Sequence, residues 1–224
     1  MEQKSPEWFA ARLGSLGSSR IAEATATIKS GGYGAGRDRV LADLVCEQIT
    51  GTSVEGFKSF AMVQGIEREP AGREAYLRHI NKGRFDDEIM IKEIGLVRHP
   101  KIAWAHASPD GLVGKDGLLE LKCPERHTHY DTLRTEKVPE QYVKQVQWQL
   151  TCTGRKWCDF ASYNPDWPEP MQLWVRRLHR DPEMIKKLES EATIFVHELL
   201  ERVAWSCKRY GITPAITLKT RVAA

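Results

Sequence analysis

The spacing of apolar residues changes along the chain, and these changes predict the order of its helices and strands. Helical spacing marks residues 6–13, 38–50, 74–79, 139–153 and 183–206. Short apolar segments between turn residues predict strands at 94–98, 102–107, 118–122, 158–163 and 171–178. No repeat or linker interrupts this order of helices, strands, helix, strands and helix. We therefore expect one α/β domain over residues 1–224, with a central mixed, twisted β-sheet flanked by helices.

Single residues indicate where some of the helices begin and end. Ser5 followed by Pro6 has the residue types preferred at an N-cap and at the first helical position. Gly51 is expected to end the helix before it. Pro70 is expected either to begin or to kink the next helix. Ser19 has two interpretations that the sequence leaves open, because its hydroxyl can cap a short second helix or serve a binding site.

Composition limits the possible functions without identifying one. The net charge is only +3, so DNA contact would have to come from local clusters of basic residues. The five cysteines show no C-x-x-C spacing, which disfavours a disulfide framework or a zinc knuckle. His127 and His129 have no third ligand nearby and are interpreted as exposed or DNA-facing residues, not zinc ligands. The glycine-rich segment 30–36 lacks the ATP phosphate-loop pattern, so no ATP is expected. With no membrane-spanning segment or signal peptide recognised, a cytoplasmic location is expected.

Candidate chemistry lies at Asp110, Glu120 and Lys122. Asp110 stands in a Pro-Asp-Gly turn, and a hairpin would bring it close to Glu120. Glu120 and Lys122 lie two apart on a predicted strand, so they share a face while Leu121 points the other way. Two carboxylates and one ammonium group would then converge. From spacing alone, an ordinary turn followed by a solvated charge pair explains the same residues.

A convergent site of this kind would suit phosphodiester hydrolysis. Carboxylate oxygens select Mg²⁺ or Mn²⁺, and the backbone carbonyl of Leu121 would complete the ligand set. Such an ion stabilises charge on the scissile phosphate and lowers the pKa of a bound water. The ammonium group of Lys122 can orient or deprotonate that water and help to stabilise the transition state.

The segments SPDGL (108–112) and LELKCP (119–124) resemble the signature of the PD-(D/E)xK nuclease superfamily. Within it, the chain is similar to the phage lambda exonuclease or viral alkaline exonuclease (YqaJ-like) family. Four further segments resemble that family's W-x-x-x-R-x-G…S, G-x-x-x-E, Q-V-Q and Y-x-P motifs. They run from Trp8 to Ser19, Gly65 to Glu69, Tyr142 to Gln147 and Tyr163 to Asp166. The similarity spans roughly residues 5 to 180 and implies a restriction-endonuclease-like core.

The resemblance also implies a role for each matching residue. The implied metal ligands are Asp110, Glu120, the Leu121 carbonyl and Glu69, the last through a second metal or its water. The implied catalytic residues are Lys122, Glu69 and Gln145. The implied pocket for a 5′-phosphate contains Arg12, Ser19 and Ser108. Taken singly, Arg12 and Glu69 are also ordinary surface charges, and Gln145 an ordinary helix position.

The activity implied by the resemblance is Mg²⁺-dependent, with Mn²⁺ as an expected substitute. It is a processive 5′-to-3′ exonuclease activity on double-stranded DNA ends that releases 5′-mononucleotides. It leaves a 3′ single strand for recombination with a single-strand annealing protein, and the family assembles as a homotrimeric ring. Three alternatives stay open: a structure-specific or restriction-type endonuclease, a non-catalytic DNA-end-binding module, and a helicase–nuclease subunit. The missing phosphate loop disfavours the last.

Overall fold

The computed structural model describes residues 2–28, 31–54, 60–84 and 87–218, without the side chains of residues 60–62. Its helices are α1 (Pro6–Arg12), α2 (Ile21–Ala24), α3 (Ala35–Thr50), α4 (Phe60–Ile80), α5 (Arg126–Thr135), α6 (Glu140–Thr153) and α7 (Pro182–Tyr210), with 3₁₀ turns η1 (Ser18–Arg20) and η2 (Glu169–Met171). Its strands are β1 (Leu16–Gly17), β2 (Ile91–Lys92), β3 (Val97–Arg98), β4 (Ala105–Ala107), β5 (Gly111–Val113), β6 (Gly117–Lys122), β7 (Trp157–Tyr163) and β8 (Leu173–His179).

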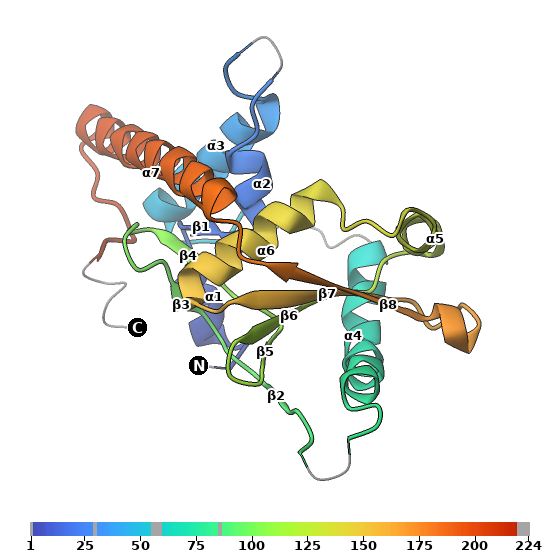
Figure 1. Ribbon diagram of the computed structural model, residues 1–224. Helices are drawn as coiled ribbons and strands as arrows, with labels where there is room; N and C mark the ends of the chain where they lie inside the picture. The colour runs from blue at the N-terminus through green and yellow to red at the C-terminus, as the bar shows by residue number, and fades with distance from the viewer. Residues whose placement is uncertain (1, 29–30, 55–59, 85–86, 219–224) are drawn as a thin grey trace.

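The main sheet is mixed and has the strand order β2-β5-β6-β7-β8. Strands β6 and β7 pair in parallel, and the other neighbours are antiparallel. Helices α5 and α6 make the crossover that a parallel pair requires. A smaller sheet of order β1-β4-β3 lies beside it. The expected mixed sheet flanked by helices is therefore confirmed (Figure 1).

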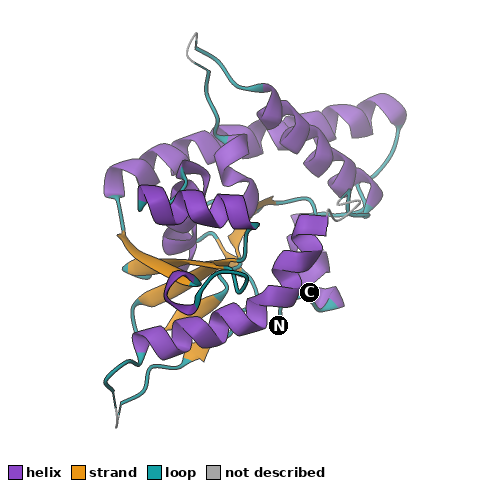
Figure 2. Ribbon diagram, turned by 90° about the vertical axis from the view of Figure 1, so that its right-hand side faces the viewer, coloured by secondary structure: helices purple, strands orange, loops and turns teal. Residues whose placement is uncertain are grey.

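Helices cover both faces of the main sheet (Figure 2). On one face, Tyr76 of α4 packs with Leu119 and Leu121 of β6. On the other face, Val146 of α6 packs with Leu118 of β6. The alternation along β6 consequently places Glu120 and Lys122 on the α6 face. Close approach of α4 depends on a small residue, since a Cβ at position 72 would lie 3.0–3.2 Å from Tyr163 and Leu121 side chains.

A third apolar cluster joins α2, α3, α6 and α7 around the smaller sheet. Its largest fully buried members include Trp148, Phe195, Leu16, Ile21 and Leu41. This helical layer fixes α6 from the side opposite the main sheet, so the face of α6 toward β6 is held in place. Within the described part of the chain, no helix is both long and apolar enough to span a bilayer.

Most expected helix ends are confirmed, with one exception at α4. Ser5 caps α1 by accepting a hydrogen bond from Trp8 N at 3.2 Å, and α3 ends before Gly51. Helix α4, however, begins near residue 60 and contains Pro70 in its interior, so Pro70 does not begin it. The hydroxyl of Ser19 caps no helix, because η1 and α2 both lack a side-chain cap.

The strands before the hairpin are shorter than expected. Segment 102–107 is a strand only over β4, because Trp104 has a φ of 61° and breaks the extended backbone. Strands β2 and β5 and helix α5 were not expected from the pattern. Helix α5 buries His129 completely, so the interpretation of His129 as exposed is wrong, whereas His127 is exposed as expected.

Candidate active site

The hairpin of β5 and β6 holds Asp110 beside the strand that carries Glu120 and Lys122. Asp110 N donates to Leu119 O at 3.1 Å, which anchors the turn to β6. Leu121 N in turn donates to Asp110 Oδ2 at 2.7 Å. These two bonds fix the Asp110 backbone and side chain against neighbouring residues of β6. The structure therefore brings Asp110, Glu120 and Lys122 to one place, as the hairpin predicts.

Glu120 is the most enclosed acid of the site, with 1% of its surface exposed. Its Oε1 lies 2.5 Å from Lys122 Nζ and accepts from Gln145 Nε2 at 2.7 Å. Its Oε2 accepts from Gln149 Nε2 at 2.5 Å. Both glutamines are on α6 and four residues apart, so they lie on one face of that helix. A buried carboxylate needs such partners, and α6 supplies two of the three.

The charges at this site perturb one another. Burial, followed by the nearby Glu120 carboxylate, raises the pKa of Asp110 to about 7. For Lys122, burial acts to lower the pKa, but the Glu120 and Asp110 carboxylates outweigh it and hold the pKa above its usual range. Lys122 is consequently a cation fixed between two acids. Perturbed titratable groups in a cavity are typical of a functional site.

A cavity of about 190 Å³ opens over these residues, and we call it the acidic cavity. It is lined by Gln3, Lys4, Trp8, Arg12, Ser18, Ser19, Glu69, His106, Ser108, Asp110, Glu120, Lys122 and Gln145. Every side chain predicted for the site therefore borders one space. Leu121 is the exception, because its side chain packs in the core and only its backbone carbonyl is proposed as a metal ligand.

Glu69 approaches the acidic cavity from α4, held by two cations. Lys4 Nζ lies 2.9 Å from Glu69 Oε2, and Arg73 Nη2 lies 3.6 Å from Glu69 Oε1. Arg73 Nη2 also donates to the backbone oxygen of Asp110 at 2.8 Å. Arg73 thereby links Glu69 of α4 to Asp110 of the hairpin, and it positions both residues relative to the cavity.

The donor set fits a hard divalent cation, although the acids do not form a compact cluster. Among the described residues, no three His, Cys, Asp or Glu side chains group closely enough to hold a metal ion by themselves. Asp110 and Glu120 supply carboxylate oxygens, the kind of ligand that Mg²⁺ prefers. Burial and the Glu120 carboxylate raise the pKa of Asp110, and a cation bound between the two acids would act against this rise.

Arg12, Ser19 and Ser108 border the same cavity from three different segments. The Arg12 guanidinium lies 4.0 Å above the Trp8 ring, which restricts its orientation. Ser19 lies on η1 and is exposed. Ser108 Oγ is buried and has no hydrogen-bond partner among the described residues. A guanidinium and two hydroxyls are suitable donors for a phosphate group.

Three residues that contribute to this geometry were not singled out from the sequence. Gln149 and Arg73 each lie four residues beyond a predicted site residue, and that helical spacing was the available signal. His106 of β4 lies two residues before Ser108, and Ser15 Oγ lies 2.6 Å from His106 Nδ1. A Cβ at position 17 would come within 3.0 Å of His106 Nε2, so glycine there makes room for the imidazole.

Comparisons with known proteins identify the family of this chain. The model of the YqaJ-like viral recombinase domain family matches residues 7–156. None of the curated proteins matches the sequence. Two crystal structures of LHK-Exo, one in complex with dAMP and one described as an alkaline exonuclease from Laribacter hongkongensis, are 40% identical in sequence. Each alignment covers 92% of this chain and 98% of the other, with TM-scores of 0.83 and 0.82.

A phage-related exonuclease from Haemophilus somnus 129PT is only 12% identical but has a TM-score of 0.64, over 84% of this chain and 96% of that one. It shows that the fold persists at low sequence identity. The family match and the LHK-Exo relatives together show that this chain is a nuclease. It belongs to the YqaJ-like viral recombinase domain family.

Proposed function

We propose that the protein is a metal-dependent exonuclease that degrades one strand of double-stranded DNA in the 5′-to-3′ direction and releases 5′-mononucleotides. One observation carries this proposal. The acidic cavity is lined by a carboxylate pair with a lysine and also by Arg12, Ser19 and Ser108. A hydrolytic centre and a phosphate-binding group thus border one space. The solved complex of the relative LHK-Exo with dAMP supports a mononucleotide as product.

Asp110, Glu120, the Leu121 carbonyl and Glu69 are the residues proposed to hold Mg²⁺, for which Mn²⁺ is an expected substitute. When bound, this ion supplies positive charge beside the scissile phosphate and makes a water molecule more acidic. Hydrolysis adds water to phosphorus and breaks the bond to the 3′ oxygen, so the remaining strand keeps a 5′-phosphate. Lys122 orients the attacking water and stabilises charge on the phosphate oxygens.

The remaining residues position these groups. Gln145 and Gln149 hold the Glu120 carboxylate, and Arg73 holds the backbone of Asp110. Arg12, Ser19 and Ser108 bind the terminal 5′-phosphate that each cut regenerates. Because that phosphate defines the distance to the scissile bond, its pocket sets the length of the released product at one nucleotide.

The family resemblance further supports a homotrimeric ring around the DNA end and digestion that is processive without ATP. It also supports cooperation with a single-strand annealing protein. Enclosure of the DNA would explain processivity, since the strand cannot leave between cuts. Light scattering of the purified protein is expected to give a mass near three chains. A monomeric mass would contradict the ring without affecting the proposed chemistry.

Digestion of linear and closed circular duplex DNA with Mg²⁺ tests the proposal. Linear DNA should be degraded to mononucleotides, and degradation should be faster from 5′-phosphorylated ends than from 5′-hydroxyl ends. Closed circular DNA should stay intact. Cutting of circles would instead support a restriction-type or structure-specific endonuclease. Binding of ends without release of nucleotides would support a non-catalytic end-binding module.

A further inference from the structure

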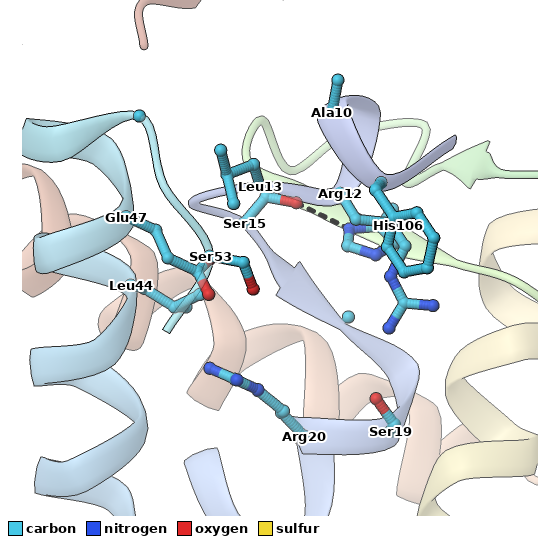
Figure 3. A pocket seen from close by; sticks show the side chains of 13 residues that line it. Ala10, Arg12, Leu13, Ser15, Ser19, Arg20, Leu44, Glu47, Ser53 and His106 are labelled. Carbon is cyan, nitrogen blue, oxygen red and sulfur yellow. Dashed lines mark hydrogen bonds between the residues drawn. The ribbon is translucent and has the colours of Figure 1, made fainter. Parts of the chain in front are cut away.

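A second cavity, between helices α1 and α3, adjoins the acidic cavity but contains none of the proposed metal ligands. We call it the α1–α3 cavity, and its volume is about 270 Å³. Arg12, Ser19 and His106 line both cavities and so form a shared wall. Figure 3 shows these three residues on one side of the space and Leu44, Glu47 and Ser53 on the other.

The charges around the α1–α3 cavity orient any anionic ligand. Glu47 is only 5% exposed, and it accepts a hydrogen bond from Gly14 N at 2.8 Å. A buried carboxylate repels phosphate, so phosphate is expected at the Arg12 side and an uncharged group beside Glu47. Arg20, the other cation of the lining, has its Nη1 3.7 Å from Asp43 Oδ2, so an acid lies beside this second cation.

The other lining residues fit an uncharged nucleoside. Phe9, Leu13 and Leu44 provide apolar surface, and residue Phe9 is 49% exposed. An accessible aromatic ring is a stacking surface for a base of any sequence. Ser53 adds a hydroxyl that can face a sugar or a base edge, whereas Ser15 Oγ pairs with His106 Nδ1 in the wall. At about 270 Å³ the space suits a single nucleoside, since sites for larger small molecules begin near ~300 Å³.

We infer that the α1–α3 cavity binds the nucleoside on the 5′ side of a phosphate held at the shared wall. This inference rests on the proposed exonuclease function. At a 5′-phosphorylated end, the terminal phosphate occupies the wall and no nucleoside lies beyond it. At a 5′-hydroxyl end, the first internal phosphate takes that place, and the terminal nucleoside enters the α1–α3 cavity.

The register of the first cut then differs between the two ends. At a 5′-hydroxyl end, water adds to the phosphorus of the second phosphodiester, and its bond to the 3′ oxygen breaks. The first product is a dinucleoside monophosphate with a free 3′-hydroxyl, and the remaining strand carries a 5′-phosphate. Every later cut releases a mononucleotide. The cavity therefore lets the enzyme start on an unphosphorylated end by using an internal phosphate.

Mass spectrometry of the earliest products tests this inference on two duplexes that differ only in the 5′ group. The wild-type protein with Mg²⁺ should release mononucleotide from the phosphorylated end and dinucleoside monophosphate from the hydroxyl end. Release of a free nucleoside first, or no release from the hydroxyl end, overturns the inference and leaves the proposed function intact. Failure to degrade the phosphorylated duplex overturns both.

Variants that change the cavity provide an independent check. Ser53→Trp narrows the cavity from an exposed position, and we expect the rate at hydroxyl ends relative to phosphate ends to fall roughly tenfold or more. The matched control is Thr52→Trp, an exposed neighbour that does not line the cavity and should keep the wild-type ratio. Phe9→Ala, also at an exposed position, should lower the same ratio by removing the stacking surface. An unchanged ratio in both cavity variants overturns the inference.

Discussion

Gln149 Nε2 lies 2.5 Å from Glu120 Oε2, on the carboxylate oxygen that Gln145 and Lys122 do not contact. Two amides from one face of α6 therefore hold the two oxygens of a single buried acid. This arrangement fixes the plane of the Glu120 carboxylate before any ligand arrives. Preorganisation of this kind is what a catalytic carboxylate requires.

Gln149→Ala should lower the exonuclease rate by roughly ten- to a hundredfold, because a hydrogen bond to a charged group contributes about 1.5–3 kcal/mol. The lost contact leaves Glu120 Oε2 without its partner, while Gln145 and Lys122 remain in place. Steady-state digestion over a range of Mg²⁺ concentrations measures the effect. The matched control is Gln141→Ala, an exposed position on the same helix. Equal rates and equal Mg²⁺ requirement in the Gln149→Ala and Gln141→Ala variants would argue against a positioning role.

Arg12→Ala should reduce the preference for 5′-phosphorylated over 5′-hydroxyl ends, because the Arg12 charge attracts a terminal phosphate of nearly two negative charges more strongly than an internal phosphate of one. A charge-assisted contact of this kind corresponds to a loss of roughly tenfold or more in that preference. The two ends are compared in competition on otherwise identical duplexes. Arg39→Ala, an exposed residue of α3 that borders neither cavity, serves as the control. Retention of the full preference by Arg12→Ala would reject the pocket.

His129 should make folding sensitive to acid. Its Nε2 lies 2.8 Å from Met171 O, and its Nδ1 lies 2.8 Å from Ser162 Oγ. A carbonyl only accepts, so Nε2 carries the proton of the neutral ring, and burial lowers the pKa of His129 below its ordinary value of 6.5. The unfolded chain then takes up a proton that the folded chain resists. Stability is retained above about pH 6.5 and lost as the pH falls below it.

Urea unfolding at several pH values measures this effect. His129→Gln should show a shallower loss of unfolding free energy on the acid side than the wild type. Some dependence should remain, since burial also lowers the pKa of His99. If the unfolding free energy falls equally with pH in the wild type and in His129→Gln, His129 does not contribute to the acid sensitivity.

The hairpin of the site was predictable because its signals are local. Turn residues before position 118 and the alternation of Leu119, Glu120 and Leu121 predict that Glu120 faces away from the two leucines, and the structure has it there, although strand β5 itself was not expected. Helices with regular apolar spacing, such as α6 and α7, were predictable for the same reason. The observed ends of these two helices differ from the predicted ends by only a few residues.

The elements and contacts that the sequence did not predict depend on interactions between distant segments. Strand β2 is two residues long and forms only by pairing with β5. Helix α5 is largely polar, and it buries His129 against Ser162 of β7, a partner 33 positions away. The contacts of Arg73 with Asp110 and of Ser15 with His106 also join distant segments. No spacing rule along the chain reveals such contacts.

The central claim is that Asp110, Glu120 and Lys122 form a metal-dependent centre that removes nucleotides from 5′ ends. The most direct test is a linear duplex labelled at the 5′ end in one sample and at the 3′ end of the same strand in another. Wild-type protein should release the 5′ label first, as a mononucleotide, and only when Mg²⁺ or Mn²⁺ is present. The variants Asp110→Asn and Lys122→Ala should each slow this release at least about a hundredfold. Release of the 3′ label first, release in the presence of a chelator, or wild-type rates in either variant would contradict the account.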